Sequence, residues 1–371
     1  MNEKISSSRG GDRYELPSHK DRVRDVDGVE QLAAWKRFTD DFWRTPPAGT
    51  PTNKTEFVFR RGFKRDKWAL YELERNDPAG YISDLQVQLM PKANTVYSRV
   101  LENRVLLLQA ASRTLATPGI YSMRDQNVGE VVFSERWAAA IDGSATEPLD
   151  AYVQPLNTGV RGKTATFRIA GKRYTGAGRA GSIERLRSTV RDWAAAAGCP
   201  YLFTEVVEQG SFTGGMAPGG HNSLHLLICR DHATWRPHVA AAVLRVGTSA
   251  SGGSGKIQSG GVSFWIEPDS GRITAGAMLR DGKLRRMERH PDTEVPVVDA
   301  VVPGWDRILA DAVGFFDQSN YLHVAGFDFV LGDAGATLIG GGNTPDVAAI
   351  QVHKPLINDP IVAEFLRREK I

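Results

Sequence analysis

One acidic residue stands inside an apolar stretch near the C-terminus of the chain. The stretch VAGFDFVL (324–331) is followed by a glycine-rich turn and a second apolar run, so the sequence predicts a β-hairpin. Asp328 is expected to face a position near Gly340 or Gly341, since cross-strand neighbours lie about 5 Å apart. A carboxylate in an apolar strand is costly to bury unless it is paired or holds a cation.

A second oxygen donor follows the hairpin. Asn343 comes directly after the three glycines that end the second run. An Asp and an Asn that meet across a hairpin suit a hard cation such as Mg²⁺, which takes few protein oxygens and completes its octahedron with phosphate and water. The alternative is a sheet-edge Asp and an ordinary Asn-Thr-Pro turn.

The segment NTGVRGKT (157–164) has residues that suit phosphate binding. It ends in the Gly-Lys-Thr of a P-loop, but Asn157 stands where the first glycine belongs. The following TATFRI alternates like a strand, whereas a P-loop needs a helix N-terminus to hold phosphate, so this is not a Walker A motif. A hairpin loop can still hold a triphosphate through backbone N–H groups and cations, and the alternative is an ordinary basic hairpin tip. The glycines and cations concerned are Gly159, Arg161, Gly162 and Lys163.

Histidine and basic clusters carry weaker signals. HNSLH (221–225) places two imidazoles four residues apart, but the segment continues as a strand, where this spacing does not converge on one metal ion. A structural histidine is the better interpretation. The basic runs at 60–67 and 279–290 are interpreted as solvated faces, and the second could border an anionic ligand.

The elements that must position these residues change in type along the chain. Apolar spacing predicts a helix over 29–44, and helical patterns continue, beyond a Pro-rich connector, to about residue 112. From about residue 130 short strands and glycine loops dominate, interrupted by a few amphipathic helices. Because strands far outnumber crossover helices, the pattern favours an α+β fold with antiparallel sheets over a doubly wound parallel sheet.

Composition narrows the class of protein. The chain has 371 residues, of which 41% are hydrophobic, so it can form two or three lobes with real cores. A net charge of +3 is too small to indicate nucleic-acid binding. Two cysteines without a metal or redox spacing indicate a reducing compartment. No apolar run suits a signal peptide or a membrane span, so we expect a cytoplasmic protein with a disordered tail over residues 1–28.

Taken in order, several stretches from about residue 95 onward resemble the ATP-grasp superfamily, in particular its sugar-transfer-associated branch. The ordered series carries the resemblance more than any single motif does. Its members are EVVEQ (205–209), HNSL (221–224), LRVG (244–247), SGGVSFWIEPDSGRI (259–273), HPDT (290–293), VPGWDRI (302–308), the hairpin, and the spacing of Asn343, Pro345 and Gln351.

The resemblance implies a fold and a reaction. The expected fold is a mainly helical region (29–112), followed by two α+β lobes (113–204 and 205–371) whose antiparallel sheets clamp a nucleotide. The expected reaction consumes ATP with Mg²⁺ as cofactor: a carboxylate becomes an acyl phosphate, and an amine captures it to form an amide. The implied partners are a small-molecule carboxylate and amine, without nucleic acid or membrane, and an oligomer is compatible with the sequence.

The resemblance also implies roles for individual residues. Strand 151–155, with Gln154, and the loop with Gly159, Arg161, Gly162 and Lys163 would cover the phosphates. The hinge residues Glu205, Val207 and Glu208 would contact adenine and ribose. Arg245 would meet the phosphate or acyl phosphate, and Asp328 and Asn343 would hold magnesium. Lys256 is assigned to the catalytic site as a residue outside the family pattern that, like Lys163, could restore a cation there.

Departures from the family pattern leave two functions open. Gln154 stands where the resemblance puts a lysine, His225 where it puts an arginine, and Gly255 and Lys256 where it puts an Asp-Asn pair. Gly341 stands in place of a glutamate that would bridge two Mg²⁺ ions. The chain is then either a divergent ligase in small-molecule or surface-polymer biosynthesis, or a catalytically degenerate protein that acts as a nucleotide- or ligand-binding or partner subunit.

Overall fold

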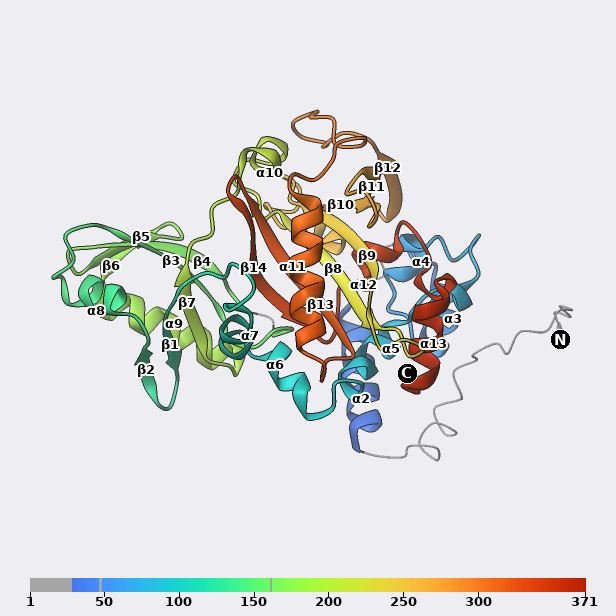
Figure 1. The fold of residues 1–371 in the computed structure, drawn as a ribbon, viewed down its shortest axis with the longest axis horizontal. Helices are drawn as coiled ribbons and strands as arrows, with labels where there is room; N and C mark the ends of the chain where they lie inside the picture. Colours follow the sequence, from blue (N-terminus) through green and yellow to red (C-terminus); the bar gives the residue numbers. More distant parts are fainter. Residues whose placement is uncertain (1–28, 47–48, 161) are drawn as a thin grey trace, which may run out of the picture.

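Two seven-stranded antiparallel sheets organise the part of the chain that the structure describes. The computed structural model describes residues 29–46, 49–160 and 162–371, so the tail expected over 1–28 and Arg161 lie outside the described residues. Figure 1 shows the first sheet in a smaller body on the left and the second sheet in a larger one beside the N-terminal helices. The predicted α+β fold with antiparallel sheets is confirmed.

The N-terminal region is helical, as predicted, but more broken than its pattern suggests. The stretch SRVLENRVLLLQAAS, expected as one helical pattern, forms two helices, because the side chain of Asn103 accepts hydrogen bonds from the backbone N–H groups of Val105 and Leu106 and starts a new helix. The elements are α2 (Val29–Arg44), η1 (Thr52–Lys54), α3 (Thr55–Arg60), α4 (Lys67–Leu70), η2 (Pro78–Gly80), α5 (Asp84–Leu89), η3 (Met90–Lys92), η4 (Thr95–Tyr97), α6 (Ser98–Glu102) and α7 (Arg104–Ala111).

The first sheet has the order β2-β1-β7-β3-β4-β5-β6. Helices α8 (Glu135–Asp142) and α9 (Ile183–Ala197) pack on one of its faces, so the alternate side chains of its strands point away from them, toward the second sheet. Helix α8 was not expected from the sequence. The strands are β1 (Ile120–Asp125), β2 (Gly129–Val132), β3 (Leu149–Pro155), β4 (Ala165–Ala170), β5 (Arg173–Gly176), β6 (Arg179–Ser182) and β7 (Tyr201–Glu205).

The second sheet has the order β12-β11-β10-β9-β8-β13-β14 and includes the predicted hairpin. Helix α11 (Trp305–Gln318) packs on one face, with Phe315 and Phe316 in the core. The strands are β8 (Ser223–Arg230), β9 (Pro237–Val246), β10 (Val262–Ile266), β11 (Ile273–Arg280), β12 (Lys283–Met287), β13 (Val324–Gly332) and β14 (Gly335–Gly342). The shorter elements are α10 (Ser211–Met216), which replaces an expected glycine-rich loop, η5 (Ile257–Ser259), α12 (Val347–Gln351), η6 (Leu356–Asn358) and α13 (Pro360–Arg368).

The other face of the second sheet is divided between a core and a polar end. At one end Leu227, Cys229 and Val324 pack against α12, α13 and the N-terminal region. Strand alternation puts Ser223 and His225 on the same face as Leu227, but closer to the first sheet. The polar residues therefore lie where the helical cover of this face ends.

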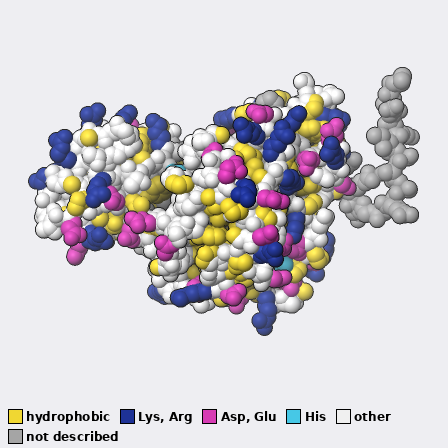
Figure 2. Space-filling view, turned by 90° about the horizontal axis from the view of Figure 1, so that it is seen from above, with side chains coloured by type: hydrophobic (Ala, Val, Ile, Leu, Met, Phe, Trp, Pro, Cys, Tyr) yellow, Lys and Arg dark blue, Asp and Glu magenta, His cyan; other side chains and the backbone are white. Residues whose placement is uncertain are grey.

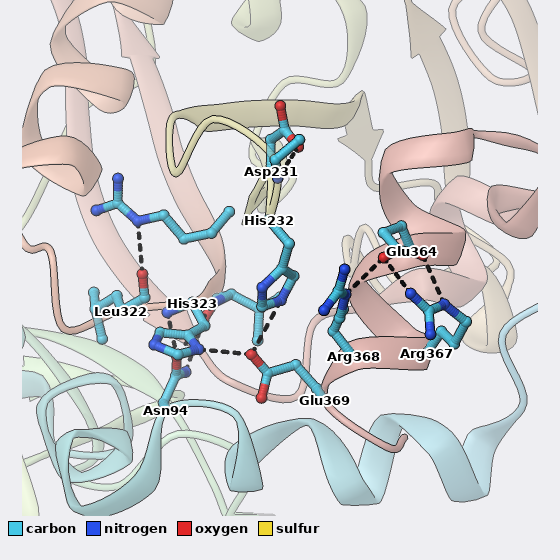
Figure 3. Close-up of polar contacts among 12 residues, drawn as sticks. Asn94, Asp231, His232, Leu322, His323, Glu364, Arg367, Arg368 and Glu369 are labelled. Carbon is cyan, nitrogen blue, oxygen red and sulfur yellow. Dashed lines mark hydrogen bonds and ion pairs between the residues drawn. The ribbon is translucent and has the colours of Figure 1, made fainter.

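Polar contacts join Asn94 of the N-terminal region and Glu369 after α13 to the second sheet and its flanking residues, as Figure 3 shows. Glu369 lies 2.7 Å from His323 and 3.2 Å from His232. The amide of Asn94 bonds the backbone of His323 and Val324 beside them. Within the described ranges, no helix is long and apolar enough to cross a bilayer.

Gln351, the last residue of the predicted Asn-Pro-Gln spacing, has a structural position. Its side chain is buried, accepts a hydrogen bond from the backbone N–H of Ile82 and donates to the carbonyl of Ile82 and the hydroxyl of Tyr71. It therefore joins α12 to the N-terminal region.

We expect Gln351→Ala to lower the free energy of unfolding by about 2 kcal/mol, because the backbone groups of Ile82 lose their partners in a buried site. Urea unfolding followed by circular dichroism measures the change. Gln126→Ala, at an exposed turn, is the matched control and should change stability by less than about 0.5 kcal/mol. Equal effects of the two substitutions would contradict the role given to Gln351.

Candidate functional site

A cavity of about 410 Å³ lies between the two sheets. Tyr152 and Gln154 of β3 line one side, and Ser223 of β8 and Val330 of β13 line the other. Such a volume is typical of small-molecule sites.

On the face that Figure 2 shows, acidic and basic side chains are interspersed, so no single charge sign dominates the molecule there.

The predicted hinge forms the closed edge of this cavity. Glu205 ends β7, and its carboxylate accepts a hydrogen bond from the backbone N–H of Gly119 at 3.3 Å. Glu205 and Val207 both line the cavity. Glu208 does not; it lines a neighbouring cavity of about 660 Å³ on the other side of the hinge, together with Arg307 of α11.

The strand face that looks into the cavity is neutral. Gln154 is 9% exposed and pairs in register with Leu202 of β7, and its side chain lines the cavity. Tyr152, two residues earlier, lies on the same face. The first sheet therefore offers an amide and a phenol here. Any cation that binds an anionic ligand in the cavity must come from another element.

A charged cluster crosses three neighbouring strands next to the cavity. Oδ1 of Asp328 on β13 lies 2.6 Å from Nδ1 of His225 on β8 and accepts a hydrogen bond of 2.6 Å from Nη2 of Arg245 on β9. Nη2 of Arg245 also donates to the hydroxyl of Ser223 at 2.9 Å. Because Ser223 lines the cavity, the charged cluster lies directly beside the cavity. Asp346 approaches Arg245 from the other side, at 3.5 Å.

Asp328 and Arg245 stabilise each other's charged forms. Burial alone would raise the pKa of Asp328, but the charges of Arg245 and then of His225 outweigh it and hold that pKa well below its usual range. Burial disfavours the charged form of Arg245 as well, yet Asp328 and Asp346 raise its pKa. The guanidinium of Arg245 and the carboxylate of Asp328 thus keep each other charged.

Arg104, at the start of α7, is a site residue that the sequence interpretation missed. Its Nη1 donates to the carbonyl of Pro155 at 2.8 Å, while its Nε is buried without a hydrogen-bond partner. Burial lowers the pKa of Arg104, and the charges of Tyr152 and Asp328 oppose this. The sequence signal for this residue was an arginine directly after Asn103, a residue that can cap a helix. It was missed because helical patterns were expected to continue through this position.

The two ends of the loop between β3 and β4 contact different parts of the molecule. Thr158 donates to the carbonyls of Glu102 and Leu101, close to the cleft, and Gly159 has a φ of +76° that favours glycine. Gly162 packs against Tyr201 and Pro155, and Lys163 lies 5.9 Å from the ring of Trp193, on the α9 side of the first sheet. The structure thus places Lys163 outside the cleft, and the predicted Arg161 lies outside the described residues.

Lys256 is exposed at the start of η5, one residue after Gly255, which packs against the backbone of Arg245. Its backbone is therefore near the charged cluster. No hydrogen bond or ion pair joins its side chain to the described residues of that cluster.

Comparison with known proteins finds a family match in this region. Residues 192–358, which include the whole second sheet, match the family model described as sugar-transfer associated ATP-grasp. The match covers less than half of the 371 residues. The resemblance inferred from the sequence is confirmed over these residues, and no curated protein matches the chain.

Solved structures with partial similarity include three ligase-type proteins. The ADP complex of N5-carboxyaminoimidazole ribonucleotide synthetase shares 10% identity at a TM-score of 0.37, over 67% of this chain and 46% of that one. D-alanine–D-alanine ligase from Bacillus anthracis, complexed with ATP, shares 11% at 0.36, over 73% and 68%. The ligase from Helicobacter pylori shares 12% at 0.39, over 73% and 61%. The chain spans less than half the length of the synthetase.

The donors predicted for the ATP-grasp magnesium site do not come together. The amide of Asn343 donates to the carbonyl of Ser98 at 3.3 Å and to the carboxylate of Glu102 at 3.4 Å, whereas the partners of Asp328 are on β8 and β9. In the described ranges no group of three or more His, Cys, Asp or Glu side chains could hold a metal ion. Asp328 and Asn343, each bonded to other protein groups, therefore do not form a shared Mg²⁺ site in this arrangement.

The hairpin register also changes the meaning of Gly341. Asp328 pairs with Gly340, and Gly341 pairs with Phe327, because a bulge follows Asp328. A Cβ at position 341 would lie 3.0 Å from Leu107 and 3.1 Å from Phe327, whereas at 340 it would meet nothing within 4 Å. A side chain that faces Asp328 must therefore come from position 340.

We expect Gly341→Glu to destabilise the protein by about 3 kcal/mol or more, since it drives a carboxylate into the apolar contact with Leu107 and Phe327. Gly340→Glu, the matched variant one residue away, should cost less than about 1 kcal/mol because its side chain has open space. Thermal and urea unfolding of the two variants measure the difference. The opposite order of stability would show that the register is wrong.

Proposed function

We propose that the chain is an ATP-dependent carboxylate–amine ligase that binds ATP in the cleft between the two sheets. One observation carries the proposal: the cavity has the hinge at one edge and continues through Ser223 into the charged cluster around Arg245. A nucleotide needs both an apolar surface for its base and cations for its phosphates. This cleft has the apolar hinge residue Val207 in its lining, and Arg245 next to its lining residue Ser223. The family match over residues 192–358 supports the same function.

The residues divide into two groups by the part of ATP that they would meet. Val207 of the hinge and Val330 and Ile339 of the hairpin give the cavity apolar walls that suit adenine, with Glu205 near the ribose. Arg245 lies beyond Ser223, and Arg104 lies at the end of β3; guanidinium groups can pair with phosphate oxygens in two parallel hydrogen bonds. Gln154 contributes a neutral donor between the two groups.

The reaction would proceed in two steps. A carboxylate oxygen of the acid attacks the γ-phosphorus and ADP leaves, which gives an acyl phosphate; the amine nitrogen then attacks its carbonyl carbon and phosphate leaves. Arg245 would stabilise the charge on the transferred group. Mg²⁺ supplies charge neutralisation in such transfers, but the donors here do not fit it, so no step is assigned to a metal. The substrates would be small molecules in cytoplasmic biosynthesis of a metabolite or surface polymer.

One observation favours a second candidate, a nucleotide-binding partner subunit without turnover. Asp328 is bonded to Arg245 and His225, and glycines stand at 340 and 341, so the hairpin offers no second carboxylate beside it. A site of this kind can bind a nucleotide and lack the groups that transfer its phosphate.

Calorimetry with ATP, ADP and adenosine, followed by assays of ADP release with panels of acids and amines, tests the proposal. We expect ATP to bind and acid-dependent ADP release to occur. Binding without ADP release under any combination would favour the partner subunit. Absence of ATP and ADP binding would refute both functions.

We expect Arg104→Met to weaken ATP binding by about tenfold to a hundredfold and to leave adenosine binding unchanged, because a lost charged contact to phosphate costs about 1.5–3 kcal/mol. Arg104→Lys should recover part of the loss. Arg99→Met, an exposed arginine on the neighbouring α6, is the matched control and should bind ATP like the unmodified chain. An equal loss of ATP and adenosine affinity in Arg104→Met would indicate a structural role instead.

A further inference from the structure

One oxygen of the Asp328 carboxylate is directed to two protein nitrogens. Both Nδ1 of His225 and Nη2 of Arg245 reach the same oxygen, Oδ1, at 2.6 Å. An oxygen of a carboxylate offers about two lone-pair sites, so Oδ1 has none left for another ligand. The side chain of His225 is 3% exposed and that of Asp328 30%, so the histidine ring is shielded from water while the carboxylate keeps partial access to solvent.

The charge around this carboxylate is balanced before any ligand arrives. Arg245 carries one positive charge and lies between two carboxylates, those of Asp328 and Asp346. Arg104 adds a second positive charge at the end of β3, where its Nη1 donates to the carbonyl of Pro155. A divalent cation that approached Oδ1 of Asp328 would meet the guanidinium of Arg245, which lies 2.6 Å from that oxygen, and like charges at such a distance repel strongly.

The same guanidinium groups can meet the phosphates directly. Nε of Arg104 is buried without a hydrogen-bond partner, and a buried donor of this kind requires a partner. Arginine pairs well with phosphate oxygens because its donors form a planar fork. The cleft therefore offers fixed cations where a metal-dependent site offers carboxylates.

We infer that Arg245 and His225 take the place of a metal ion on Asp328, so that the cleft binds ATP equally well with and without Mg²⁺. The inference rests on the nucleotide binding in the proposed function and makes that binding independent of Mg²⁺. Asp328 then acts as a positioning residue: it holds Arg245 at the end of the cavity and competes with phosphate for the same guanidinium.

This role and a metal-ligand role predict opposite effects of Asp328→Asn. If Asp328 competes with phosphate for Arg245, removing its charge leaves ATP affinity unchanged or increases it, with Mg²⁺ and with EDTA alike. If Asp328 holds a metal, the same substitution weakens ATP binding in Mg²⁺ and has no effect in EDTA. Asparagine has nearly the same shape and retains an acceptor oxygen for Arg245, so the variant should fold.

The experiment is calorimetric titration of ATP into the full chain and its Asp328→Asn variant, each in MgCl₂ and in EDTA, with unfolding temperatures as a check of folding. We expect the Kd of the unmodified chain to differ by less than about fivefold between the two buffers, which corresponds to about 1 kcal/mol. Asp346→Asn, which removes the more distant carboxylate from Arg245, is the matched control and should act in the same direction with a smaller effect.

The outcomes separate this inference from the function on which it rests. A larger loss of affinity in EDTA, or weaker binding by Asp328→Asn in Mg²⁺ alone, overturns the inference while nucleotide binding stands. Absence of ATP binding in both buffers overturns nucleotide binding itself, and the inference with it. If Asp328→Asn does not fold, the comparison of buffers in the unmodified chain still decides.

Discussion

The contact between Asp328, Arg245 and His225 organises the polar end of the second sheet. Three neighbouring strands each contribute one of these side chains. Asp328 is bonded to both of the others, and its negative charge and the positive charge of Arg245 stabilise each other. Removing any one would leave a charge in a poorly solvated place, which is far more costly than losing an exposed ion pair. The register of β8, β9 and β13 and the electrostatics of the cleft are therefore two aspects of one arrangement.

The position of this contact follows from how the sheet is covered. Helix α11 closes one face along its length, while α12, α13 and the N-terminal region close only part of the other. Side chains of β8 change from apolar to polar where that cover ends, from Leu227 to His225 and Ser223. The first sheet faces this polar end. The cleft therefore forms between the part of the second sheet that α12, α13 and the N-terminal region leave uncovered and the face of the first sheet that α8 and α9 leave uncovered.

The sequence predicted elements whose local signals agree with their packing. The helix over 29–44 and the hairpin were correct because apolar spacing and turn residues indicated the same structure. Helix α8 was missed because it is only eight residues long, so its apolar spacing covers about two turns and gives a weak periodic signal. The α6–α7 boundary, and Arg104 with it, depended on the cap formed by Asn103, which competed with an uninterrupted helical pattern.

Two features of the site could not be deduced from the sequence. One bulged residue in β14 decides whether position 340 or 341 faces Asp328, and alternation alone does not locate a bulge. The direction of Lys163 depends on Trp193 and Tyr201, which are 30 or more residues away in the chain and pack against the loop only in the folded protein. The family resemblance supplied the site residues but not their orientations.

The segment from Ser98 to Arg104 contacts both halves of the cleft. Glu102 and Arg104 bond the end of β3 and its loop, while Ser98 and Glu102 bond Asn343 at the end of β14 (Figure 1). Any rotation of one sheet relative to the other must stretch or break one set of these bonds. The segment 98–104 therefore ties the two sheets together and limits how far the cleft between them can open.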